Sequence, residues 1–302
     1  MPAFRGTPGS AVLRGVLFMV GATALFIVMN TTVKLLSAHL PVAEIIWART
    51  LGHLVLIVAL FAPTHGGWRL LVTRAPAAQF SRSVLLIAST SLFFTAIGRV
   101  PLADATAVSF TAPLVVAALA GPVLGERVTV GHWIAIAAGF LGALLVIAPS
   151  GAGFNPWATL VVGSAACYAG YQLLTRHVAA VDAPETSVTY SALVGTLLMS
   201  AIVPFVWKTP ESLSHALPLA ALGLFGGLGH YCVARAFALG AASIMSPFHY
   251  VQLVWAAALG YLVFGDVPGV ATWFGAALII GSGLFVALSE RRRSSSTGGR
   301  RT

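Results

Sequence analysis

The stretch AASIMSPFHYVQLVWAAALGYLVFGD, residues 241–266, decides what kind of chain this is. It is long and apolar enough to cross a lipid bilayer, yet its first half carries Ser246 and His249, which a helix surrounded by lipid has no reason to hold. Pro247 has no N–H and its ring crowds the carbonyl of Ser243, so that carbonyl would lose its helical partner. These residues predict a kinked membrane helix with a side that faces protein, water or a small polar ligand.

Composition extends this conclusion to the whole chain. Of the 302 residues, 58% are hydrophobic and only 8% are charged, with a mean hydropathy of +0.92, whereas about a quarter of a soluble domain is charged. The net charge of +9 does not indicate nucleic-acid binding, because the basic residues are scattered between apolar runs and cluster only at 291–293. Cys167 and Cys232 lie inside apolar runs, so we expect packed thiols and no disulfide framework. The chain is predicted to be an integral membrane protein that has the lipid bilayer as a partner and no nucleic acid.

Proline, glycine and charged residues divide the sequence into apolar segments that are each long enough for a hydrocarbon core about 30 Å thick. The predicted fold is an all-α integral membrane protein with ten transmembrane helices, near residues 13–37, 42–62, 78–98, 102–124, 130–148, 155–176, 186–206, 216–238, 242–264 and 270–289. Pro113 inside the fourth segment frees the carbonyl of Ser109, much as Pro247 frees that of Ser243.

The basic residues predict the orientation of these segments, because cytoplasmic loops carry an excess of Lys and Arg. With the N- and C-termini cytoplasmic, thirteen Lys and Arg residues, Arg82 among them, fall on the cytoplasmic side. Four fall on the other side: Lys34, Arg49, Arg99 and Lys208. The last residues, 290–302, are expected to form a disordered cytoplasmic tail.

The two halves of the chain resemble each other in sequence. Shifted by 140 positions, Gly125-Glu126 falls on Gly265-Asp266 and Trp133 falls on Trp273. Each half would hold five spans, and an odd number makes the second half enter the membrane from the opposite side. Inverted repeats of this kind belong to secondary transporters, with the binding site between the halves near the bilayer midplane. We expect a first repeat at 1–150 and a second at 151–289.

Ten spans in two five-helix halves, each closing with Gly-Glu or Gly-Asp, then V-x-x-W and a Gly/Ala-rich last helix, resemble the EamA family of the drug/metabolite transporter superfamily. The resemblance covers residues 12–289 and, within the family, is greatest to bacterial aromatic amino acid exporters of the YddG type. It implies a multi-pass protein of the bacterial inner membrane. It also implies a central cavity surrounded by spans one, three, four, six, eight and nine, with spans five and ten outside.

Motifs for catalysis are absent from the sequence. It contains no G-x-x-x-x-G-K-[ST], H-E-x-x-H or G-x-S-x-G and no metal-binding Cys/His spacing, so we expect neither an enzyme nor a cofactor. All carboxylates fall near predicted span ends, whereas His53, His230 and His249 are predicted at depth, where a neutral imidazole can remain. Three roles are open for the Arg49 side chain: it binds a substrate carboxylate, forms an ion pair with Glu44, or snorkels toward the membrane surface.

Polar and aromatic residues on helix faces form the predicted substrate site. In the sixth segment such residues recur at helical spacing. The side-chain amides of Asn30 in the first segment and Gln172 in the sixth occupy equivalent positions in the two repeats. The alternative for these residues is hydrogen bonding between helices, packing, or, for tryptophan, the membrane interface. The predicted substrate-binding residues are Asn30, Thr90, Phe94, Ser109, Phe110, Tyr168, Tyr171, Gln172, His230, Tyr231, Ser246, His249, Tyr250 and Trp255.

This lining is uncharged and rich in rings, so it predicts a small-molecule substrate that is a neutral, aromatic amino acid. The predicted function is export or facilitated diffusion by alternating access, by a protein that acts as a monomer. One alternative is the same fold with another solute, such as a nucleoside, a drug or S-adenosylmethionine. A membrane-embedded enzyme is the alternative from a different class, and it would need a clustered acid/base or metal site. A seven-helix receptor is disfavoured, because the only lysine in any span is Lys34, in the first.

Overall fold

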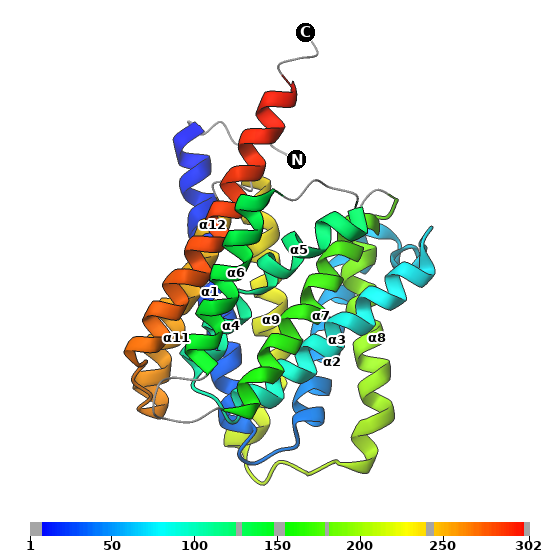
Figure 1. The fold of residues 1–302 in the computed structure, drawn as a ribbon. Coiled ribbons are helices and arrows are strands. Elements are labelled where there is room, and N and C mark those ends of the chain that lie inside the picture. The colour runs from blue at the N-terminus through cyan, green and yellow to red at the C-terminus, as the bar shows by residue number, and fades with distance from the viewer. Residues whose placement is uncertain (1–7, 125–128, 148–154, 179–180, 240–244, 299–302) are drawn as a thin grey trace.

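Helices follow the predicted apolar segments along almost the whole chain (Figure 1). The structure is a computed structural model that describes residues 8–124, 129–147, 155–178, 181–239 and 245–298. In chain order the elements are α1 (Pro8–Leu36), α2 (Val42–His65), η1 (Gly67–Leu71), α3 (Pro76–Ile97), α4 (Leu102–Ser109), α5 (Ala112–Leu124), α6 (Val130–Ile147), α7 (Pro156–Val178), α8 (Pro184–Ile202), η2 (Val203–Phe205), α9 (Leu213–Leu239), η3 (Ser246–Tyr250), α11 (Val251–Phe264) and α12 (Val270–Gly298).

Proline and glycine set several of the helix ends. Pro76 and Pro184 occupy the first turn of α3 and α8, where a missing N–H costs no hydrogen bond. Gly66 and Gly265 end α2 and α11 with φ of 72°, a left-handed conformation that most side chains disfavour. These helices therefore end at residues whose conformational preferences are readable in the sequence.

Seven helical segments of the described chain are long and apolar enough to cross a membrane, and two shorter apolar helices, Phe248–Phe264 and Val270–Val286, accompany them. Helix α7 is not among the seven, because Tyr168, Tyr171 and Gln172 interrupt its apolar residues. The helices are those of a multi-pass membrane protein, and the count of ten crossings stays a prediction.

Two segments predicted as continuous helices are each broken. The segment 102–124 is divided into α4 and α5, because Pro113 cannot donate to Ser109 and the N–H groups of Phe110 and Thr111 instead bond three residues back. In the segment 242–264 the described part begins at Met245, which has helical backbone angles, and the 3₁₀ turn η3, which contains Pro247, precedes α11. Ser243 lies outside the described residues, as do Gly125 and Glu126.

Helix α12 continues to Gly298, although the sequence predicts an unstructured tail from residue 290. The stretch 290–297 contains neither proline nor glycine, so nothing in it stops a helix that is already formed. Helix α1 begins and α12 ends at the same end of the bundle (Figure 1), here called the terminal end. The α1–α2 and α11–α12 connections lie at the opposite end.

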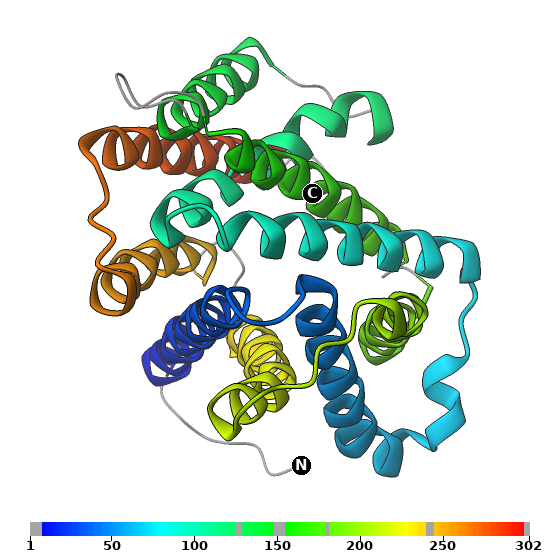
Figure 2. The ribbon, with the colours of Figure 1, turned by 90° about the horizontal axis from the view of Figure 1, so that it is seen from below.

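The most extensive packing joins the first half of the chain to the second. Helix α1 packs against α9, α3 against α7, and α6 against α12, while α2 contacts both α8 and α9. Seen from below, α3 and α7 cross the middle of the molecule side by side, with α6 and α12 on one flank and α1, α2, α8 and α9 on the other (Figure 2). Equivalent helices of the two halves make equivalent contacts. If α1, α2, α3 and α6 are exchanged with α7, α8, α9 and α12 in that order, the same four packed pairs result: α1–α9, α3–α7, α6–α12 and α2–α8.

Glycines bring two of these helix pairs into backbone contact. A Cβ atom added to Gly142 would lie 2.6 Å from the carbonyl oxygen of Gly275, between α6 and α12. One added to Gly52 would lie 3.1 Å from the Cα of Gly223, between α2 and α9. Small residues allow such close approach, which favours association of helices in lipid.

Candidate functional site

Arg49 is a cation that lies within the bundle. It lies two turns into α2, where its Nε donates to Met29 Sδ at 3.4 Å and its guanidinium carbon is 5.6 Å from the centre of the Phe94 ring. Within the described part of the chain no carboxylate pairs with Arg49. Glu44 is fully buried, its Oε2 accepts the backbone N–H of Lys208 at 3.0 Å, and its Oε1 has no partner in the described chain, so the structure does not form the alternative Arg49–Glu44 ion pair.

Two tyrosines of α7 face this guanidinium. The rings of Tyr168 and Tyr171 stack with centroids 5.4 Å apart, and both side chains interact electrostatically with Arg49. Although Tyr168 interacts with Arg49 inside the bundle, the side chain of Tyr168 remains 38% exposed. The exposed surface of Tyr168 therefore faces a space that protein atoms do not fill.

Two histidines, His53 and His230, lie near Arg49, and a third, His249, lies near His230. His53 follows Arg49 by one turn of α2 and stacks on His230 of α9, with ring centroids 5.6 Å apart and planes within 11°. Phe26 meets His230 edge to face at 5.1 Å. His249 of η3 interacts electrostatically with His230, whose side chain is exposed despite these neighbours.

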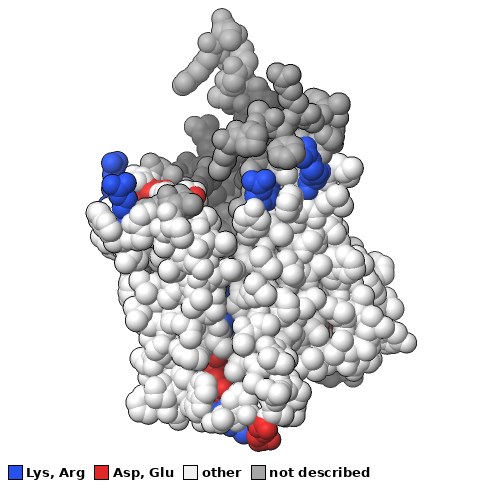
Figure 3. Space-filling view, turned by 180° about the vertical axis from the view of Figure 1, so that it is seen from behind, with Lys and Arg blue, Asp and Glu red and all other residues white. Residues whose placement is uncertain are grey.

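We call the residues that share this space the central cluster. Its members come from α2, α7, α9 and η3, and each is a base or a phenol: Arg49, His53, Tyr168, Tyr171, His230 and His249. Seen from behind, the body of the molecule is mostly uncharged, and basic side-chain atoms are visible inside a crevice that runs along it (Figure 3).

A second aromatic contact lies at the helix breaks. Phe110, at the end of α4, meets Tyr250, at the end of η3, with ring centroids 5.0 Å apart and planes at 82°. A Cβ atom on Gly283 of α12 would lie 2.5 Å from the Tyr250 hydroxyl, so glycine there leaves room for the phenol. The two breaks therefore meet through these rings.

Toward the terminal end, the central cluster borders a buried network around Arg82, which is 1% exposed. Arg82 donates to Gln79 Oε1 at 3.0 Å, to the Ser187 carbonyl at 2.6 Å and to Thr175 Oγ1 at 3.0 Å. It also donates to the Tyr171 hydroxyl at 3.1 Å, and its guanidinium lies over that ring at 4.8 Å. The sequence places Arg82 among the cytoplasmic flanking charges, and the structure instead buries it between α3, α7 and α8.

Asp182 anchors the outer edge of this network. Its carboxylate accepts hydrogen bonds from the Arg74 backbone N–H at 2.9 Å, from Gln79 Nε2 at 2.8 Å and from the Thr73 hydroxyl. Desolvation opposes ionisation, but these hydrogen bonds outweigh it and hold the pKa of Asp182 below its ordinary value.

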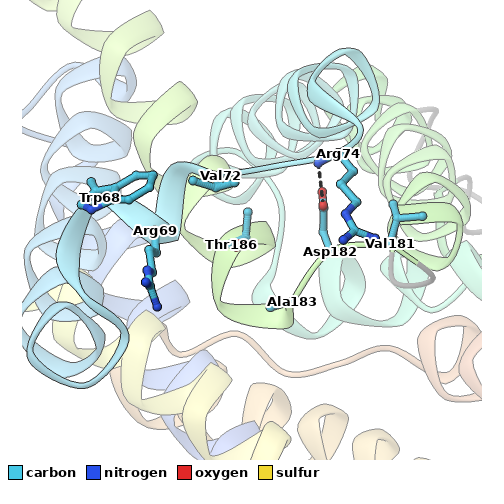
Figure 4. Close-up of a pocket in the computed structure, with 8 residues that line it drawn as sticks. All are labelled: Trp68, Arg69, Val72, Arg74, Val181, Asp182, Ala183 and Thr186. Atoms are coloured by element: carbon cyan, nitrogen blue, oxygen red, sulfur yellow. Dashed lines mark hydrogen bonds between the residues drawn. The ribbon is translucent and has the colours of Figure 1, made fainter.

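A shallow pocket of about 410 Å³ lies beside Asp182 (Figure 4). Arg74 is bonded to Asp182 there, while the side chain of Arg69 points away from both. The pocket contains none of the predicted substrate-binding residues; it is lined by Trp68, Arg69, Val72, Arg74, Val181, Asp182, Ala183 and Thr186.

The structure brings some of the predicted site residues together in the central cluster and at the breaks. They are Phe94, which contacts Arg49, together with Phe110, Tyr168, Tyr171, His230, His249 and Tyr250. Asn30 is buried on α1 beside Met29, and Thr90 and Gln172 are half-buried on α3 and α7.

Other predicted residues have different surroundings. The Ser109 hydroxyl donates to the Thr106 carbonyl of its own helix at 2.7 Å. Trp255 packs against Ile27 and Leu102, away from Arg49, and its Nε1 is buried without a hydrogen-bond acceptor in the described chain. Tyr231 is 46% exposed. The side chain of Ser246 lies outside the described part of the structure.

The predicted substrate-binding residues do not include Arg49, for which a substrate carboxylate is one of three alternatives, nor His53, Phe26 and Met29. One signal in the sequence could have found the first two: an arginine and a histidine four residues apart lie on one face of a helix. Phe26 and Met29 look like ordinary apolar helix residues, and only their contacts with His230 and Arg49 distinguish them.

A bundle of membrane helices with broken segments and a polar, aromatic interior defines an integral membrane protein of the transporter class. The chain belongs to the EamA-like transporter family, whose model matches residues 13–148 and again residues 155–288. The family expected from the sequence is thereby confirmed, and it is a family of transporters, not of enzymes.

Curated relatives carry the names of several substrates. The chain is 29% identical to a riboflavin transporter of Vibrio cholerae, over 93% of this chain and 95% of that protein. It is 28% identical to an S-adenosylmethionine uptake transporter of Rickettsia prowazekii, over 80% and 81%. It is 31% identical to the pseudopaline exporter CntI of Pseudomonas aeruginosa, over 92% and 97%. A solved chain that is 21% identical shares the fold, with a TM-score of 0.59 over 94% of this chain and 98% of that one.

Proposed function

We propose that the protein is a secondary transporter of small organic solutes that combine a carboxylate with a planar ring, with aromatic amino acids as the first candidates. The observation that carries this proposal is Arg49, an arginine inside the bundle with aromatic neighbours and no acidic partner in the described chain. A guanidinium matches a carboxylate in geometry and in charge.

The rings around Arg49 supply the second half of this specificity. Tyr168 and Tyr171 offer a stacked pair, and Phe94 lies under the guanidinium. A planar ring stacked on such a wall gains about 0.5–1.5 kcal/mol beyond the burial of its area. The ammonium of an amino acid needs acceptors, and the Ser109 carbonyl, to which Pro113 cannot donate, is one of them.

S-adenosylmethionine is the second candidate substrate. It has the carboxylate of an amino acid and the planar ring of adenine, so the same residues would serve it. The 28% identity to an S-adenosylmethionine uptake transporter favours it. Riboflavin has a planar ring but no carboxylate and would leave Arg49 without an anionic partner.

The architecture that we propose is two inverted repeats, 1–150 and 151–289, of five transmembrane helices each. Two observations support it: the family model matches the chain twice, and the main helix pairs are unchanged when the helices of the two halves are exchanged. Transport would follow by rocking of the halves about the contact of Phe110 with Tyr250.

The proposed location is the bacterial inner membrane, with both termini cytoplasmic and a monomer as the working unit. The positions of α1 and α12 support termini on one side, because the first begins and the second ends at the same end of the bundle. The relatives include both uptake and export proteins, so the direction of transport has to be argued from the site itself.

Flux of radiolabelled tryptophan into vesicles that contain the purified protein tests the proposed function. We expect phenylalanine, tyrosine and S-adenosylmethionine to compete, and tryptamine and adenosine, which lack the carboxylate, to compete at least about tenfold more weakly. Empty vesicles are the control. Absence of tryptophan flux, or equal competition by tryptamine and phenylalanine, would contradict the proposal.

A further inference from the structure

The central cluster consists of bases and phenols without an acid. Arg49 and His53 share one face of α2, and His53 stacks on His230 at 5.6 Å. The elements packed around them contribute uncharged residues from α1, Phe94 and, bonded to Tyr171, Arg82 from α3, tyrosines from α7 and His249 from η3. No carboxylate of the described chain interacts with Arg49, His53 or His230.

Several carboxylates that the structure describes near the two ends of the bundle are engaged elsewhere. Glu44 of α2 accepts the Lys208 backbone N–H through Oε2, while its buried Oε1 has no partner in the described chain. At the end opposite the termini, Asp266 pairs with Lys34 at 2.9 Å and Asp104 accepts from Thr272 at 2.7 Å. At the terminal end, Asp182 is bonded to Gln79 and Arg74. No described carboxylate therefore balances a protonated imidazole in the central cluster, and the carboxylate of the substrate would do so.

This arrangement couples two binding events. A proton added to His53 or His230 places a second positive charge near Arg49, where the surrounding protein screens charges poorly. A carboxylate bound to Arg49 cancels that repulsion, so each ligand strengthens the binding of the other. By thermodynamic linkage, the proton raises the affinity for the carboxylate by the same factor by which the carboxylate raises the affinity for the proton. Such factors are typically about 5- to 150-fold.

We propose that the stacked pair His53–His230 is the proton-coupling site of this protein and that a proton and the carboxylate substrate cross the membrane in the same direction. The inference rests on the proposed function, because it needs a substrate carboxylate at Arg49. With the proton gradient directed into the cell, it assigns uptake to this chain in place of the export expected from the sequence.

Proton exchange with the medium on substrate binding tests the inference. Tryptophan is added to the purified protein in weakly buffered detergent solution near pH 6.5, and a pH dye reports protons taken up. We expect net uptake of protons, up to about one per tryptophan bound, because the substrate carboxylate removes the repulsion by which Arg49 keeps a proton off the neighbouring imidazoles. The double variant His53→Gln/His230→Gln should lose most of this uptake per tryptophan bound.

A matched control removes a histidine from another stacked pair. His39, in the α1–α2 connection, and His215, in the first turn of α9, stack with ring centroids 4.4 Å apart. His39→Gln should leave the proton uptake per tryptophan unchanged. Release of protons by the unsubstituted protein, or undiminished uptake in the double variant, would overturn the inference.

The unsubstituted protein provides a second test if the double variant fails to fold. We expect tryptophan to bind about tenfold more tightly at pH 5.5 than at pH 7.5, and an affinity that is flat or falls on acidification would contradict the inference. Exchange of labelled for unlabelled tryptophan without any gradient separates the two claims. Absence of exchange refutes the proposed function, whereas exchange without a proton effect refutes only the coupling.

Discussion

Phe110 and Tyr250 meet edge to face, with ring centroids 5.0 Å apart, although they stand at the ends of helical segments from different halves of the chain. Both rings lie at a break in a membrane helix, and proline occurs at each break, Pro113 in one and Pro247 in the other. The contact therefore joins the two places where the backbone of the bundle departs from a regular α-helix.

The first prediction concerns this contact. Phe110→Ala and Tyr250→Ala should each lower the rate of tryptophan flux and the thermal stability of the protein in detergent. Because the rings interact directly, the two losses of stability should fall short of additivity by about 0.5–1.5 kcal/mol in the double variant. Thermal unfolding of the four proteins measures the coupling, and strict additivity would show that the rings do not depend on one another.

The second prediction concerns the stability of Arg49 variants. Arg49→Met removes a half-buried charge that pairs with no carboxylate of the described chain, so it should not lower the thermal unfolding midpoint, although it should abolish most tryptophan flux. Arg69→Met, which alters an exposed residue of η1, is the control and should change neither quantity. A loss of stability in Arg49→Met would mean that Arg49 has a structural role.

Arg82 should behave in the opposite way, and this is the third prediction. Arg82→Met leaves the Ser187 carbonyl, Gln79 and Thr175 without the donor that satisfies them, and hydrogen bonds to a charged group contribute about 1.5–3 kcal/mol each. We expect the variant to lose at least about 2 kcal/mol of stability. An unfolding midpoint equal to that of the unsubstituted protein would show that the network contributes nothing.

The fourth prediction is a pH dependence. Hydrogen bonds hold the pKa of Asp182 below its ordinary value of 3.8, so the folded state binds this proton less readily than the unfolded state does. The stabilisation is therefore complete above pH 3.8 and is lost as the pH falls through the lowered pKa. Asp182→Asn should be less stable than the unsubstituted protein at pH 7, and the difference should shrink on acidification. A difference that is constant down to pH 3 would contradict this.

The sequence predicts the positions of the helices well, because each long apolar run has to cross lipid and because proline and glycine end helices for local reasons. The segment 130–148 corresponds to α6 at Val130–Ile147, for example, and 42–62 corresponds to α2 at Val42–His65. It does not predict that Pro113 ends α4, because a proline can either kink a membrane helix or break it, depending on neighbouring helices.

The site was harder to predict, because its key features depend on contacts between distant residues. Glu44 is five residues from Arg49, yet in the described chain it bonds to Lys208, which is far along the sequence, and not to Arg49. Arg82 resembles a flanking charge in the sequence, and only the packing of Ser187 and Tyr171 on it reveals a buried residue. Local patterns show which residues share a helix face but not what covers that face.

Equilibrium binding of tryptophan and of tryptamine to the purified protein and to Arg49→Met tests directly whether Arg49 binds the carboxylate of the substrate. The two ligands share the indole ring and the ammonium and differ only in the carboxylate. We expect the unsubstituted protein to bind tryptophan at least about tenfold more tightly than tryptamine, and Arg49→Met to bind both equally weakly. Equal affinities in the unsubstituted protein, or an undiminished preference for tryptophan in Arg49→Met, would contradict the account.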